Sequence, residues 1–149
     1  MERDDQFFLR HVQNVKHIFC DKWTIAVMVA LARGPMRRSE IFATVGSYSI
    51  DEDWPGKATV LHDSILSKTL RKMVAERLVT RQELPDTFPR HVRYALRPEA
   101  VNFLERVRQV VDWSEHNAHV VASAQEFHRL NSEDPDDFDH GLYELPASG

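Results

Sequence analysis

One stretch of the chain, residues 61–94, changes its hydrophobic periodicity part of the way along, and this change restricts the fold more than any other feature. After Leu78 the period falls from about 3.6 to about 2, which indicates two strands, residues 78–84 and 91–96. Before it, apolar residues recur at three- and four-residue steps along one side of a helix: Ile65, Leu66, Leu70, Met73 and Val74. Helix, strand, loop and strand is the order of a winged helix.

The segment between the two predicted strands is bracketed by Pro85 and Pro89. Because proline has no backbone N–H to offer a ladder, this segment should form a protruding loop between antiparallel strands. We expect this loop to be the wing. Basic side chains surround it in the sequence: Arg81, Arg90, His91 and Arg93.

Two helices are predicted at the start of the chain. Residues 5–19 carry apolar side chains at near-helical spacing with charged residues between them, so they should form an amphipathic helix. Residues 21–33 begin at Asp21, an acidic N-cap candidate, and stop at Gly34-Pro35. The second segment is apolar nearly all round, so we expect it to be the central buried helix.

A third, shorter helix is predicted over residues 39–45, with Ser39 as N-cap and Gly46 as stop. The connection to the next helix, residues 46–60, is longer than the roughly 2 to 8 residues that usually join helices, which makes it a candidate functional loop. Within it, Trp54-Pro55-Gly56 suits a type II turn, with proline and glycine at the two central positions.

The last predicted helix begins near Pro98 and continues to about residue 123. A helix with apolar surface on more than one side needs a second partner, and pairing with another copy of the chain and with the first helix would supply it. Two apolar stripes can be drawn on it, one from Val101, Leu104, Val111, Ala118 and Val121, and the other from Phe103, Val107, Val110 and Trp113.

The net charge of −4 argues at first against a nucleic-acid partner, because phosphate contacts need clustered Lys and Arg. The average hides an uneven distribution: residues 34–97 hold 11 Lys and Arg against 8 Asp and Glu, whereas residues 124–149 hold 1 against 7. We therefore expect residues 1–123 to form one domain, and residues 124–149 to be an acidic, largely disordered tail.

The compartment follows from apolar runs and cysteine content. The longest apolar run, residues 25–32, is far shorter than the roughly 20 residues that span a bilayer, and no charged-then-apolar leader opens the chain. The single cysteine, Cys20, cannot form an intramolecular disulfide, which fits a reducing compartment. We expect a cytoplasmic protein.

Catalytic and metal-binding patterns are weak. Residues 62–64 contain the letters of a hydrolase triad, but neighbouring residues on a helix point about 100° apart and cannot form the required hydrogen-bond chain. His116, His119 and His128 are loosely metal-like, yet no carboxylate or cysteine completes a diagnostic spacing, so we favour solvated or interface histidines. No Gly-rich phosphate loop is present, and we expect neither an enzyme nor a cofactor or metal.

The polar side of the helix after residue 61 offers a nucleic-acid interface. A plain solvated face is the alternative for such residues, but the two-stranded wing that follows favours DNA. Serine and lysine suit phosphates, and Arg71 could read or clamp a guanine edge. The stripe contains no large hydrophobe and consists of Ser64, Ser67, Lys68 and Arg71.

Taken together, these segments resemble the HxlR family of bacterial winged-helix transcription regulators, relatives of the MarR group, over roughly residues 8–117. The resemblance implies a homodimer on a pseudopalindromic operator, with the helix after residue 61 in the major groove and the wing beside it. The matching pieces are Asp21-Lys22-Trp23-Thr24, Gly34-Pro35, Arg38-Ser39-Glu40-Ile41, Ile65-Leu66-Ser67-Lys68-Thr69-Leu70-Arg71, Arg77-Leu78-Val79, Pro89-Arg90-His91-Val92-Arg93-Tyr94-Ala95-Leu96 and Trp113.

The chain departs from the family pattern at several positions. The family usually has a tight turn in place of residues 46–60 and glycine in place of Cys20. It also tends to have an aromatic residue in place of Arg38 and a second proline in place of Arg90. With the resemblance, the expected DNA contacts are Arg38, Ser64, Ser67, Lys68, Arg71, Lys72, Arg90, His91 and Arg93.

Cys20 has two interpretations. Some members of the family use a cysteine near the start of the chain as a redox sensor, and His17 and Lys22 nearby favour that role. However, Cys20 directly precedes Asp21-Lys22-Trp23, where packing against the buried helix is expected. We favour a buried structural cysteine, because free cysteine is among the most buried residues and reactivity needs an exposed, electropositive setting.

Four aromatic residues are candidates for an effector site: Trp23, Tyr48, Trp54 and Trp113. Tyr48 and Trp54 belong to the long loop region and could simply cover one end of the core, which we favour slightly. The alternative is a pocket, walled by this loop and the dimer helices, for a small hydrophobic or aromatic compound that changes the spacing of the two recognition helices.

The sequence therefore predicts a dimeric, sequence-specific DNA-binding regulator of the α+β class, mainly α, with dimerisation helices at both ends. Repression is expected, because a bound dimer without an activation domain can act by blocking polymerase. The alternative is a winged-helix ligand-binding or protein-interaction module that no longer binds DNA, which the weak basicity and the acidic tail favour.

Overall fold

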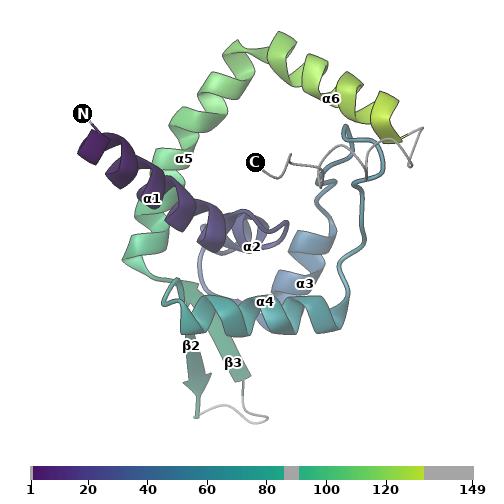
Figure 1. The fold of residues 1–149 in the computed structure, drawn as a ribbon. Helices are drawn as coiled ribbons and strands as arrows, with labels where there is room; N and C mark the ends of the chain where they lie inside the picture. Colours follow the sequence, from purple (N-terminus) through teal and green to yellow (C-terminus); the bar gives the residue numbers. More distant parts are fainter. Residues whose placement is uncertain (1, 86–90, 133–149) are drawn as a thin grey trace, which may run out of the picture. The chain divides into compact units, whose positions relative to one another are not determined.

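A computed structural model describes residues 2–85 and 91–132, except for the side chains of residues 2 and 3. Figure 1 shows a mainly helical chain with a small sheet. Contacts divide the chain into two compact units, one formed by residues up to 48 together with 61–107, the other by residues 49–60 together with those from 108 on. The elements are α1 (Glu2–Phe19), α2 (Thr24–Leu31), β1 (Met36–Arg37), α3 (Arg38–Gly46), α4 (Asp63–Ala75), β2 (Val79–Leu84), β3 (His91–Leu96), α5 (Pro98–His116) and α6 (Ala118–Ser132).

Helix α2 lies at the centre of the first unit, as its composition predicts. Val27 and Met28 are fully buried, and only Val29 among its apolar side chains is exposed. The helix begins later than expected, at Thr24, but Asp21 still caps it: its Oδ1 accepts hydrogen bonds from the backbone N–H of Trp23 (3.0 Å) and of Thr24 (2.8 Å). Helices α3 and α4 also contribute buried side chains to the core: Ile41, Val45, Leu66, Leu70 and Met73.

The sheet is three-stranded and antiparallel, in the order β1-β3-β2. Strands β2 and β3 form the hairpin that the alternating pattern predicts, and Arg81 pairs with Tyr94 and Gln82 with Arg93. Strand β1 was not predicted, since a two-residue strand has no measurable period; it joins the other edge of β3, with Met36 opposite Tyr94. The wing loop, residues 86–90, lies outside the described residues.

A tight turn joins α4 to the wing. The N–H of Arg77 donates to the carbonyl of Val74 (3.1 Å) and the N–H of Leu78 to that of Met73 (2.9 Å). These two bonds form a Schellman motif, which requires a left-handed residue after the helix. Arg77 occupies that position at φ 62°, where glycine is usually found.

The predicted helix over residues 98–123 is in fact two helices, α5 and α6, separated at Asn117. The Asn117 side chain donates to the carbonyl of Trp113 (2.8 Å), while its own carbonyl accepts from the N–H of Val120 (2.9 Å). Asparagine competes for backbone groups in this way, which ends one helix and starts the next. The prediction of disorder from residue 124 is therefore wrong for residues 124–132, which belong to α6; residues 133–149 lie outside the described part.

The second unit brings residues 49–60 together with α6. The Lys57 N–H donates to the carbonyl of Trp54 (3.1 Å) and Gly56 has φ +70°, as the predicted type II turn requires. The rings of Trp54 and His128 meet edge to face, with centroids 6.1 Å apart. Trp54 thus packs within this unit.

No described helix is both long and apolar enough to cross a membrane.

Candidate nucleic-acid interface

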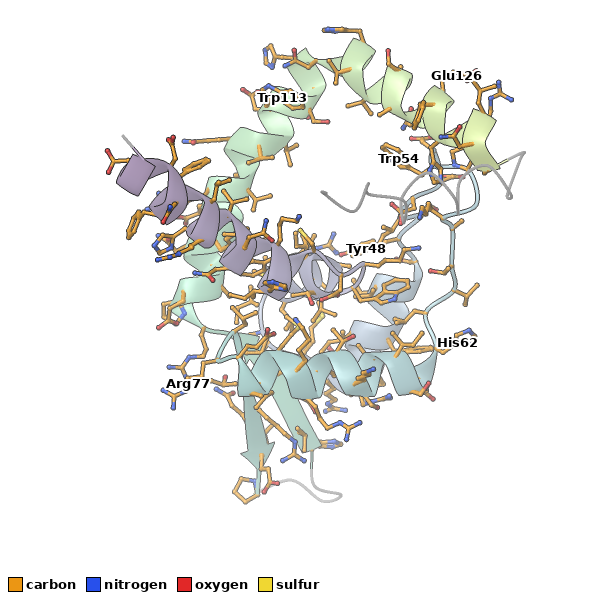
Figure 2. The ribbon with its side chains drawn as sticks, in the orientation of Figure 1. Tyr48, Trp54, His62, Arg77, Trp113 and Glu126 are labelled. Carbon is orange, nitrogen blue, oxygen red and sulfur yellow. The ribbon has the colours of Figure 1, made fainter. Side chains whose placement is uncertain are left out.

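Helix α4 presents one apolar side and one polar side, as its periodicity predicts. Leu66, Leu70 and Met73 are buried, which fixes the rotation of the helix. On the opposite side, exposed residues follow one another at steps of four, three and four, so they share one face. In Figure 2, the labelled residues His62 and Arg77 mark the two ends of this helix. The exposed face consists of Ser64, Lys68, Arg71 and Ala75.

Lys68 and Arg71 are the exposed cations on this face. Neither has an ion pair within the part of the chain that the structure describes. Long cationic side chains that point to solvent from a helix face are free to reach phosphate oxygens or a guanine edge. With Ser64 at the start, the face can donate hydrogen bonds along more than one turn.

Arg38, the first residue of α3, lies across the start of α4. Its Nη1 donates to Oδ1 of Asp63 (2.9 Å), and its Nη2 donates to the Asp63 carbonyl (2.8 Å) and to Oγ of Ser67 (2.7 Å). Ser67 is only half-buried, and its hydroxyl accepts this bond. The guanidinium therefore joins the two helices of the helix-turn-helix.

Lys72 is a correction to the expected DNA contacts. Its ammonium points away from the exposed face and donates to the carbonyl of Ile18 (2.9 Å) and to Oε1 of Glu76 (2.8 Å). The carboxylate of Asp21 lies 3.4 Å away. An ammonium surrounded by these oxygens is already solvated by protein, so Lys72 serves to fix α4 against the end of α1 and the start of α2.

The same network sets the ionisation of Asp21. Burial tends to raise the pKa of its carboxyl, but hydrogen bonds from the Thr24 hydroxyl and from the backbone of Thr24 and Trp23, together with the charge of Lys72, outweigh burial. The pKa of Asp21 therefore lies below its usual value of 3.8.

The wing hairpin places its basic residues on two faces. Residues opposite each other in an antiparallel pair share a face, so Arg81 lies with Tyr94, and Arg93 lies with Gln82 on the other side. A hollow of about 240 Å³ between α4 and the Arg81 face is lined by Leu70, Arg71, Val74, Ala75, Arg81 and Tyr94.

Arg81 is a candidate that is missing from the DNA contacts expected from the sequence, although it was noted among the basic residues around the wing. Hydrogen bonds from its guanidinium to Glu83 and Tyr94 raise its pKa, so it stays charged. The alternation of β2, combined with the pairing to Tyr94, is the signal that would have placed it beside Arg71. Of the other wing candidates, His91 is half-buried opposite Leu84, Arg93 is exposed, and Arg90 lies outside the described residues.

Cys20 is exposed, which contradicts the expected burial. It occupies the short connection between the end of α1 and the start of α2, where Phe19 turns into the core and the next side chain turns out. Phe19 takes the packing position, since its ring stacks on Phe103 with centroids 3.6 Å apart. The residue before the cysteine therefore takes the buried position, in contact with α5.

The four aromatic candidates for an effector site are divided between the units. Trp23 and Tyr48 belong to the first unit, with the Lys22 ammonium 5.8 Å from the Trp23 ring centroid and the Tyr48 hydroxyl buried without a hydrogen-bond partner among the described residues. Trp54 and the exposed Trp113 belong to the second unit. An effector pocket formed by these residues stays a prediction.

Among the described residues, no cluster of His, Cys, Asp or Glu could hold a metal.

A helix pair whose second helix has an exposed basic face, followed by a two-stranded hairpin, defines a winged helix-turn-helix protein. A family model described as HxlR-like helix-turn-helix matches residues 18–121. The chain belongs to this family, as the sequence motifs indicated.

Comparison with individual proteins gives the same class. The HTH-type transcriptional regulator YtfH of Escherichia coli K12 is 25% identical over 112 residues, which cover 75% of this chain and 77% of YtfH. A crystal structure of a MarR-family transcriptional regulator from Enterococcus faecalis V583 shares 22% identity and a TM-score of 0.60, covering 77% of this chain and 92% of that one. The reduced form of the regulator YodB from B. subtilis shares 19% identity and a TM-score of 0.58, covering 70% and 89%.

The structural similarities support the fold, while family membership gives the function in outline. The protein is a DNA-binding transcriptional regulator of the helix-turn-helix type. The matched family and YtfH are of the helix-turn-helix regulator class.

Proposed function

We propose that the protein binds a specific operator as a homodimer and represses transcription by occluding polymerase. The observation that carries this proposal is the exposed face of α4, where Ser64, Lys68 and Arg71 point to solvent from a helix held rigidly by the core. In this arrangement α4 enters the major groove, Ser64 and Lys68 contact phosphates, and Arg71 reads a guanine edge.

The wing contacts the backbone or minor groove beside that site, through Arg81, His91, Arg93 and Arg90. Arg81 joins this set because it shares the hollow with Arg71. Arg93, on the other face of the hairpin, is suited to a phosphate contact that carries no sequence information.

Dimerisation rests on apolar surface that a single copy leaves uncovered. Exposed large apolar residues on one element indicate an interaction surface when they occur together. On α1 they are Phe7, Phe8, Leu9 and Val15, and on α5 they are Val101, Val110, Val111 and Trp113.

Sedimentation of the full chain should give a dimer, and Phe8→Glu should shift it toward monomer. A wild-type monomer at micromolar concentration would rule this interface out.

The deciding experiment selects DNA fragments from a random pool with the purified protein, then measures their affinity over a range of salt concentrations. Operator binding should survive near-physiological salt with a steep log–log slope. Arg71→Ala should relax specificity at one position, and Arg93→Ala should weaken binding to all sequences alike. Arg33→Ala, which removes an exposed arginine beyond the end of α2, is the matched control and should change neither. If wild-type protein binds no fragment saturably, the interaction-module alternative replaces this proposal.

Two modes of control accompany the proposal. A hydrophobic or aromatic effector bound near Trp23, Tyr48, Trp54 or Trp113 should change tryptophan fluorescence; a flat response across a panel of compounds would count against it. Thiol oxidation is supported by the exposure of Cys20 and by the similarity to the redox regulator HypR, at 21% identity over 71% of this chain. Oxidant should then alter DNA binding of the wild type and leave Cys20→Ser unaffected.

A further inference from the structure

The start of α4 carries a charge conflict. Asp63 is the first residue of the helix, where a carboxylate interacts favourably with the positive end of the helix dipole. The same position is a natural binding place for a phosphate, which the carboxylate would repel. Lys68 and Arg71 follow on the same helix, so an uncompensated Asp63 would oppose them on the surface proposed to meet DNA.

Arg38 resolves this conflict. One guanidinium contacts the Asp63 carboxylate, the Asp63 carbonyl and the Ser67 hydroxyl, at 2.7 to 2.9 Å. The Arg38 side chain is 38% exposed and that of Asp63 is 76% exposed, so the carboxylate is the more exposed member of the pair. A planar fork with several donors can satisfy three acceptors in fixed positions, which a lysine ammonium cannot match.

We infer that Arg38 is a positioning residue for DNA recognition rather than a direct phosphate contact. It neutralises Asp63, holds the first turn of α4 against α3, and orients the Ser67 hydroxyl by donating to its oxygen. The inference rests on the proposed DNA-binding function and changes the role assigned to Arg38.

The test asks whether a second substitution, at Asp63, restores the operator affinity that Arg38→Ala loses. Arg38→Ala leaves the Asp63 carboxylate uncompensated, so affinity for the selected operator fragment should fall by about tenfold, within the range for loss of one specific interaction. Adding Asp63→Asn removes the repulsive charge while keeping a residue suited to a helix start, so the double variant should regain most of the lost affinity. If Arg38 contacted phosphate directly without compensating Asp63, Asp63→Asn would raise the affinity by the same factor in the wild type and in Arg38→Ala.

A charge-matched control separates the local neutralisation of Asp63 from the effect of the protein's net charge. Glu40→Gln in the Arg38→Ala background gives the same net charge from an exposed residue of α3 whose carboxylate is paired with Arg37 (3.9 Å). It should not restore binding; equal restoration would overturn the inference. Arg38→Lys, which keeps the charge and loses the fork, should fall between wild type and alanine, and circular dichroism should confirm that all variants are folded.

The outcomes for the two proposals are distinct. Saturable wild-type binding without rescue by Asp63→Asn overturns the role of Arg38 alone. Absence of saturable wild-type binding overturns the proposed function and this inference with it. Rescue by Asp63→Asn and not by Glu40→Gln supports both.

Discussion

The ammonium of Lys72 lies 3.4 Å from the carboxylate of Asp21, so the helix that carries the candidate DNA-binding face is tied to the residue that caps the central helix. One turn earlier on the same helix, Lys68 points to solvent. These two lysines have the same chemistry and opposite surroundings, which makes them a natural pair for experiment.

Lys72→Ala should lower the free energy of unfolding by about 1 kcal/mol, after allowance for screening, since about a third of the side chain is exposed. Lys68→Ala should leave stability within about 0.5 kcal/mol of wild type and reduce the slope of log affinity against log salt by about one. Urea unfolding and fluorescence anisotropy with operator DNA measure the two quantities. An exchange of these effects between the two variants would contradict the orientation of α4.

The depressed pKa of Asp21 predicts a pH dependence of stability. Because the folded carboxyl binds a proton less tightly than the unfolded one, its contribution is complete above the unfolded pKa and is lost as pH falls through the folded pKa. The stability difference between wild type and Asp21→Asn should therefore be constant near neutral pH and shrink only below about pH 4. Unfolding by urea across this range checks it; a difference that shrinks as pH rises toward neutral has the wrong sign.

Arg77→Gly should stabilise the protein by about 0.5 to 1 kcal/mol, because glycine adopts the left-handed conformation at φ 62° without steric cost. Arg77→Ala retains the strain and serves as the control, with little change expected. Thermal unfolding of the three proteins gives the comparison. A loss of stability in the glycine variant would show that the Arg77 side chain itself stabilises the turn.

Cys20 should react with a thiol reagent in the folded protein, at a stoichiometry of one per chain, because its side chain is exposed. Cys20→Ser should have unchanged stability, since no core contact is lost. A spectrophotometric titration before and after denaturation provides the measurement. Reaction that occurs only after denaturation would mean that the thiol is covered in the assembled protein.

Periodicity predicted the winged helix because its determinants are local. The apolar steps of α4 and the alternation of β2 and β3 each arise from neighbouring residues, so the change of period near Leu78 marked the boundary correctly. The cap at Asp21 was predictable for the same reason, because Asp21 lies within three residues of the N–H groups that it binds. The predicted cap at Ser39 is wrong, since α3 already begins at Arg38 and Arg37 holds the N-cap position.

The orientation of single side chains and the interruption of the last helix were harder to predict. The sequence shows that Lys72 is basic and helical, but only the approach of Asp21 and Ile18 in space turns it inward. A lone asparagine inside a strong helical pattern gave little warning that Asn117 would divide the last helix. The burial of Cys20 was argued from residue-type preference, and its neighbour Phe19 took the core position instead.

The turn between α4 and β2 joins the start of the wing hairpin closely to α4. Only three residues, Glu76, Arg77 and Leu78, separate helix from strand, and all three donate their N–H groups back to α4. The recognition helix α4 and the start of the hairpin are therefore coupled by backbone hydrogen bonds. In the proposed complex, a signal that withdraws α4 from its groove would lift the start of the hairpin as well, so we expect release from DNA to be a single concerted event.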